Sequence, residues 1–151
     1  MGYHSDQALD LEQESYIALF SCYRDCEGAN SRKLIIQSKD SEEELTEIPL
    51  FHNSAVVFST DTNRRFKHKI ILDRAAAPGN EWLGVTFRTS KTFVDYTENG
   101  VFFEDGVPLT VADEEQKKEF YKLRGMENRE SEFSYPRLRY TISESDLMKP
   151  N

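Results

Sequence analysis

The feature that most constrains the fold of this chain is a series of short segments in which apolar and polar residues alternate. The clearest segment is 64–72, where Phe66, His68 and Ile70 share one face while basic residues occupy the other. Alternation with a period of two is typical of a strand with one buried and one solvated face. The pattern therefore places His68 on the inward face, among apolar neighbours.

Similar segments recur along the chain, with turn residues between them. Strands are predicted at 15–23, 33–38, 44–50, 54–60, 64–72 and 81–90, with a hairpin formed by 93–96 and 101–103. Asp61-Thr62-Asn63 is predicted as a turn, and both faces of 81–90 are predicted to be covered. Short strands with no helix between them indicate a mainly β fold, an antiparallel sandwich or barrel of the jelly-roll type.

One C-terminal helix is predicted, from Asp113 to Arg124. Thr110 resembles the first residue of a capping box completed by Asp113, and Gly125 is the expected stop. Acidic residues gather early in this helix and basic residues late, as the helix dipole favours. A narrow apolar stripe predicts that the helix covers an outer face of the sheet.

Length and charge restrict the classes of protein. At 151 residues the chain is one domain by length, and its net charge of −8 argues against a broadly basic surface that follows phosphates. No apolar run is long enough to span a bilayer and no leader precedes the first motif, so we expect no membrane partner and an intracellular setting. Cys22 and Cys26 lack further zinc ligands nearby and are interpreted as reduced thiols.

Three side chains suggest a metal site. The tripeptide His4-Ser5-Asp6 supplies one imidazole and one carboxylate, and His68 supplies a second imidazole from the inward face of its strand. Two histidines and one carboxylate form the facial triad of non-haem Fe(II) oxygenases. Arg88 and Ser90, predicted on one strand face, would bind the carboxylate of an organic acid by charge-assisted hydrogen bonds. A single His-x-Asp or a single inward histidine is more often structural, so the prediction depends on the combination.

The motifs resemble those of the Fe(II)- and 2-oxoglutarate-dependent dioxygenases, most nearly the AlkB-like branch. The resemblance covers residues 3–94 and includes Tyr3-His4-Ser5-Asp6, the stretch from Ser54 to Ile70, and Val85-Thr86-Phe87-Arg88. It implies a double-stranded β-helix, a jelly-roll (cupin-like) core at 1–94. Residues 95–151 would form a C-terminal extension with a hairpin and helix, packed on the same domain. Because AlkB-like proteins carry a first core strand ahead of the corresponding motif, we expect an N-terminally truncated form.

The resemblance also implies roles for individual residues. His4, Asp6 and His68 would hold Fe(II), and Arg88 with Ser90 would hold 2-oxoglutarate in a pocket lined by Thr86 and Trp82. AlkB-like proteins carry an arginine where this chain has Trp82, and Arg88 with Ser90 looks instead like the Arg-x-Ser arrangement of other branches.

The leading hypothesis is a dioxygenase that uses molecular oxygen and 2-oxoglutarate for oxidative hydroxylation or demethylation, with succinate and CO2 as co-products. Its primary substrate is left open among nucleic acid, protein and small molecule. The alternative hypothesis is a non-catalytic jelly-roll binding module.

Overall fold

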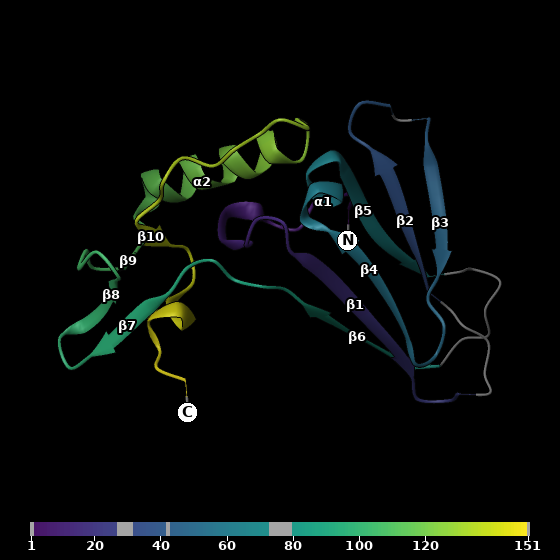
Figure 1. Ribbon diagram of the computed structural model, residues 1–151, viewed down its shortest axis with the longest axis horizontal. Coiled ribbons are helices and arrows are strands. Elements are labelled where there is room, and N and C mark those ends of the chain that lie inside the picture. Colours follow the sequence, from purple (N-terminus) through teal and green to yellow (C-terminus); the bar gives the residue numbers. More distant parts are fainter. Residues whose placement is uncertain (1, 27–31, 42, 73–79, 151) are drawn as a thin grey trace.

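The computed structural model describes residues 2–26, 32–41, 43–72 and 80–150, and the chain is mainly β (Figure 1). The strands are β1 (Tyr16–Tyr23), β2 (Arg32–Ser38), β3 (Leu45–Pro49), β4 (Ser54–Ser59), β5 (Phe66–Leu72), β6 (Trp82–Phe87), β7 (Val94–Thr97), β8 (Gly100–Phe103), β9 (Thr110–Val111) and β10 (Tyr140–Thr141). The helices are α1 (Thr60–Arg65), α2 (Glu114–Glu127) and the 3₁₀ turns η1 (Ala8–Asp10) and η2 (Glu144–Leu147). None of the helices in these described ranges is long and apolar enough to cross a membrane.

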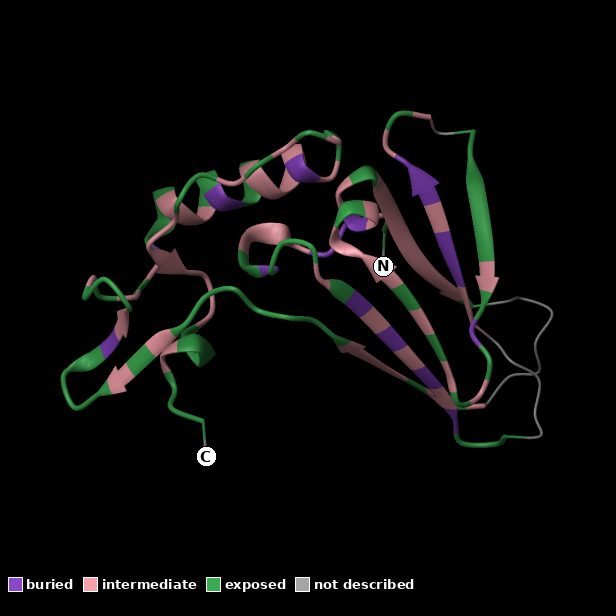
Figure 2. Ribbon diagram, in the orientation of Figure 1, coloured by how far each residue is buried: buried purple, intermediate pink, exposed green. Residues whose placement is uncertain are grey.

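Two antiparallel sheets, with strand orders β4-β1-β6 and β3-β2-β5, pack face to face around the core. Leu19 of β1, Leu34 of β2 and Leu50 form the buried centre. Partly buried residues from both sheets surround it, namely Val56, Trp82, Ile36, Ile48 and Ile70. Buried positions alternate along β1, as expected for a strand with one covered face (Figure 2). The mainly β, antiparallel prediction is confirmed.

The later part of the chain forms a separate group of elements beside the two sheets (Figure 1). β7 and β8 make the predicted hairpin, and β9 and β10 form a short parallel pair. The C-terminal end of α2 returns to the N-terminal segment, where Asn128 accepts a hydrogen bond from the backbone of Ser5. The extension is therefore in direct contact with the beginning of the chain.

Several element boundaries differ from the sequence prediction. The predicted turn at Asp61-Thr62-Asn63 is part of α1, whose N-cap Ser59 accepts a hydrogen bond from the backbone N–H of Thr62 at 3.0 Å. The capping box of α2 is formed by Asp113 and Gln116 rather than by Thr110. The helix also continues past Gly125 to Glu127, because its last turn is held against the N-terminal segment.

Strand β6 is shorter than predicted and is open on one side. It ends at Phe87, so the alternation that placed Arg88 and Ser90 on one strand face does not extend to them. The prediction that both faces of this segment are covered is wrong, since Leu83 and Phe87 are each 59% exposed. No other described element covers them, and the outward face of this sheet is apolar.

We predict that Gly84→Ala destabilises the fold. A Cβ atom at position 84 would lie 2.2 Å from the ring of Trp82, which packs in the core and donates a hydrogen bond to Ser21. Overpacking of this kind costs about 1–3 kcal/mol, measurable by urea denaturation. Gly125→Ala is the matched control, because its Cβ would meet only Arg129 at 3.6 Å. It should stabilise α2 by about 0.5–1 kcal/mol, and equal effects of the two variants would contradict the assignment.

Candidate metal centre

The N-terminal segment 4–11 joins the two sheets at one end of the sandwich, and it is called the strap below. The backbone N–H of His4 donates to the carbonyl of His68 at 3.0 Å, and the N–H of His68 donates to the carbonyl of His4 at 2.7 Å. Farther along, Leu11 forms an antiparallel bridge with Ser90, just beyond β6. The segment thus runs from the edge of β5 in one sheet to the end of β6 in the other.

Polar side chains fix the middle of this strap. Ser5 donates from its backbone to Oδ1 of Asn128 at 2.8 Å and from its hydroxyl to the carbonyl of Phe66 at 2.9 Å. The amide of Asn63 accepts from the backbone N–H of Asp6 at 2.8 Å and donates to its carbonyl at 2.6 Å. Ser5, Asp6 and Asn63 are all buried, so the backbone around Asp6 is held in one position.

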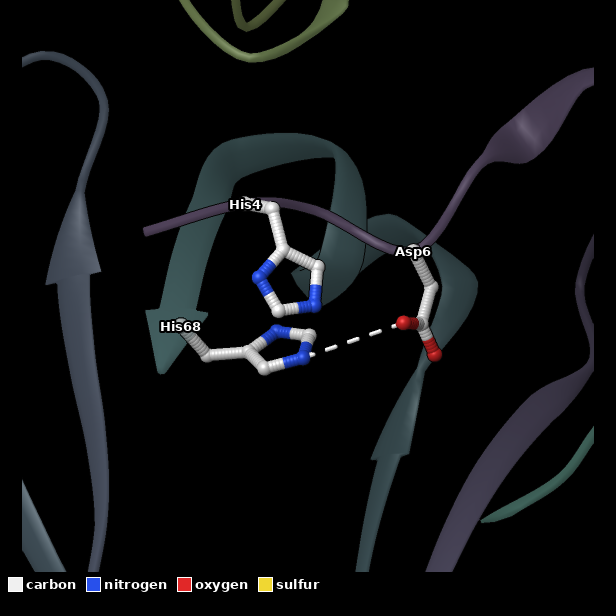
Figure 3. A group of neighbouring side chains, drawn as sticks. All are labelled: His4, Asp6 and His68. Atoms are coloured by element: carbon white, nitrogen blue, oxygen red, sulfur yellow. Dashed lines mark ion pairs between the residues drawn. The ribbon is translucent and has the colours of Figure 1, made fainter. Parts of the chain in front are cut away.

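His4, Asp6 and His68 converge on a shared space (Figure 3). One potential ligand atom from each side chain lies within 4.8 Å of the other two. Nε2 of His68 is 3.8 Å from Oδ1 of Asp6, and the two imidazole rings are 4.7 Å apart between centroids. The structure therefore brings together the three residues that the sequence singled out, although 62 positions separate Asp6 from His68.

Each imidazole offers one ring nitrogen to the shared space. Nδ1 of His4 lies 3.0 Å from the carbonyl oxygen of Gly2, which can only accept, so the neutral ring carries its proton there and leaves Nε2 free. Burial lowers the pKa of His68, opposed by the nearby charge of Asp6. The lowered pKa favours the uncharged imidazole, which is the form that binds metal ions.

Arg88 contacts one oxygen of the Asp6 carboxylate and leaves the other oxygen facing His68. Its Nε and Nη2 each lie 2.9 Å from Oδ2 of Asp6, whereas Oδ1 faces His68. The carboxylate is nearly buried, and Arg88 supplies the opposite charge that a buried carboxylate needs. Arg88 therefore orients Asp6 so that one oxygen remains directed into the shared space, as outer partners of metal ligands commonly do.

The remaining predicted residues lie in different surroundings. An open cavity of about 660 Å³ is lined by His4, Asp6, Arg88 and Ser90, among others. Ser90 donates its hydroxyl proton to Asp10 at 2.7 Å instead of joining Arg88. Trp82 packs in the core and Thr86 lies on β6 opposite Leu19, and neither is among the described residues that line this cavity.

The donor set fits a first-row divalent cation. Two imidazole nitrogens and one carboxylate oxygen could together hold a metal ion. Two histidines and one carboxylate are a donor composition that suits Fe(II). His4 and Asp6 also line the open cavity, so one side of the centre is accessible to a further ligand. The residues that hold this arrangement, Asn63 and Asn128, carry no motif, and sequence reasoning placed Asn63 in a turn.

No protein-family model matches this chain, and comparison with curated proteins gives no match either. Its function is therefore inferred from the chemistry of the site and from the resemblance of its motifs.

We predict that Asn63→Ala destabilises the protein by about 2–4 kcal/mol, because it leaves the buried N–H and C=O of Asp6 without partners. Asn128→Ala removes a single bond and should cost about half as much. Asn99, which is exposed in the β7–β8 turn, is the control, with an expected change within about 0.5 kcal/mol. Urea denaturation measures all three variants, and equal stabilities would show that the strap is not held by these amides.

A second prediction concerns Glu127, which accepts hydrogen bonds from the backbone of Ala8 and from Tyr135, both at 2.7 Å. Burial raises the pKa of its carboxyl above 4.5, partly opposed by these bonds. A carboxyl whose pKa is raised on folding contributes stability below its unfolded pKa, and this contribution is lost as the pH rises through the folded pKa. Glu127→Gln should therefore remove a fall in unfolding free energy above pH 4.5. Thermal denaturation across this range tests it, and an unchanged pH profile would contradict the assignment.

Proposed function

We propose that this protein is an Fe(II)- and 2-oxoglutarate-dependent dioxygenase built on a double-stranded β-helix. The convergence of His4, Asp6 and His68 is the observation that carries the proposal. Two face-to-face antiparallel sheets support the jelly-roll core, and the motifs that resemble the AlkB-like branch support the reaction class.

The chemistry of this class comes from its cofactors: bound Fe(II) and 2-oxoglutarate would use molecular oxygen to hydroxylate or demethylate a substrate, releasing succinate and CO2. The protein's own residues would bind the metal ion and orient the side chains that hold it. His4, Asp6 and His68 would hold the ion, and Arg88 would keep Asp6 in the ligating orientation. Phe58 packs its ring edge against that of His68 at 5.8 Å between centroids, which would help to hold the imidazole in place.

We expect Mn(II), used as a redox-stable substitute, to bind and raise the melting temperature. At a metal concentration of 100 times Kd the gain is about 2.7 kcal/mol, or roughly 5–10 °C for a chain of this size. His4→Ala and His68→Ala should each weaken binding by at least about 100-fold, because loss of an outer partner alone costs about 10- to 100-fold. Isothermal titration calorimetry measures the affinity.

His52→Ala is the control, because the ring of His52 lies outside the site and accepts a hydrogen bond from the backbone of Tyr23. Succinate formation from 2-oxoglutarate with Fe(II) and ascorbate tests turnover. If His68→Ala forms as much succinate as the parent, the role of His68 is wrong. If neither divalent metal nor 2-oxoglutarate raises the melting temperature, the alternative of a non-catalytic binding module is favoured.

A further inference from the structure

Among the described residues that line the open cavity beside the candidate metal centre, four carry charged side chains. These are Asp6, Asp10, Arg88 and Arg124. A ligand that enters the cavity can form ion pairs only with groups whose partners within the protein leave them available. The contacts of each group therefore indicate which one receives a charged ligand.

Three of the four are already engaged. Nε and Nη2 of Arg88 both contact Oδ2 of Asp6, so this pair neutralises itself. Asp10 accepts from the hydroxyl of Ser90 at 2.7 Å and from the backbone N–H of Thr92 at 3.0 Å. Moving Arg88 onto a ligand would leave the buried carboxylate of Asp6 without its partner, which is unfavourable.

Arg124 differs from the other three. It lies in the last turn of α2 and is half-buried, and within the described part of the chain its guanidinium has no hydrogen-bond or ion-pair partner. The carboxylate of nearby Glu127 is directed elsewhere, toward Ala8 and Tyr135. The same contact to Ala8, with that of Asn128 to Ser5, fixes this turn of the helix against the strap. Arg124 is thus a cation that lines the cavity, and its acidic neighbour Glu127 turns its carboxylate toward Ala8 and Tyr135 rather than pairing with the guanidinium.

The charge of the cavity indicates the kind of ligand. The two carboxylates and two guanidiniums among the lining residues balance in charge, and a bound divalent cation would then leave the site positive. A dicarboxylate would restore neutrality, with one end at the metal centre and the other at a guanidinium. A planar guanidinium binds a carboxylate through two parallel hydrogen bonds, which gives orientation as well as affinity.

We infer that Arg124, rather than Arg88, binds the distal carboxylate of 2-oxoglutarate in this cavity. The inference rests on the proposed function and assigns its cosubstrate anchor to α2, in the C-terminal extension. Arg88 is then a positioning residue that acts through Asp6. Replacement of Arg124 is therefore predicted to weaken binding of the distal carboxylate, whereas replacement of Arg88 is predicted to act through the orientation of Asp6.

The experiment compares two ligands on the Mn(II)-loaded protein by isothermal titration calorimetry. 2-Oxoglutarate carries the distal carboxylate, and 2-oxobutyrate lacks it. The parent should bind 2-oxoglutarate more tightly by about 10- to 100-fold, the usual effect of a hydrogen bond to a charged group. Arg124→Gln should abolish this preference without changing affinity for 2-oxobutyrate or Mn(II). Arg124→Lys should retain part of it.

Lys122→Gln is the matched control, since it removes the same charge from an exposed position on the same helix. This variant should bind 2-oxoglutarate in preference to 2-oxobutyrate as strongly as the parent does. If Arg124→Gln also keeps that preference, or if Arg88→Gln alone abolishes it with Mn(II) affinity intact, the inference is overturned. If the parent binds no Mn(II), or binds 2-oxoglutarate no better with Mn(II) than without, the proposed function itself fails.

Discussion

The candidate site depends on the reciprocal pair of backbone hydrogen bonds between His4 and His68. Through these bonds the single residue His4 pairs with the edge of β5, and this pair sets the register of the strap that follows. Side chains of residues paired across antiparallel strands lie close together, which is why the two imidazoles meet. The strap has no regular strand of its own and consists of loop and the short η1 turn. Its order therefore comes from anchors at both ends, and a shift of one residue would turn His4 away from the site.

Burial of the Asp6 carboxylate gives the site its second constraint. A buried charge is unfavourable unless it is paired and hydrogen-bonded, and here the guanidinium of Arg88 meets both conditions through its Nε and Nη2 atoms. Because the contacts from Arg88 go to Oδ2, the ion pair leaves Oδ1 facing His68. The same pairing that makes the buried carboxylate tolerable therefore aims one of its oxygens at the candidate ligand position.

The sequence was informative where side-chain periodicity decides the structure. Alternation in β1 and β5 predicted both strands and placed His68 on the inward face, which its contact with Phe58 confirms. It was misleading where tertiary contacts decide. α2 continues through Gly125 because the turn that follows is tied to the strap. Local propensity cannot report such contacts.

The partners of the site residues were the least predictable part. Pairing Arg88 with Ser90 assumed that β6 continues, but the strand ends at Phe87 and the two side chains engage Asp6 and Asp10 separately. Asn63 and Asn128 belong to no sequence pattern, because the role of each amide depends on the distant backbone groups to which it is hydrogen-bonded.

The contacts of α2 make the C-terminal extension part of the site as well as an appendage to the core. Glu127 and Asn128 bond to the backbone of Ala8 and Ser5, on either side of Asp6. Displacement of the helix would remove both bonds and leave Ser5, which is 1% exposed, without one of its partners. If a metal ion binds the candidate centre, its binding and the docking of α2 should favour each other, since each orders the same strap. A ligand bound between the strap and this helix would therefore be coupled to the geometry of the candidate ligands His4 and Asp6, which line the same cavity as Arg124.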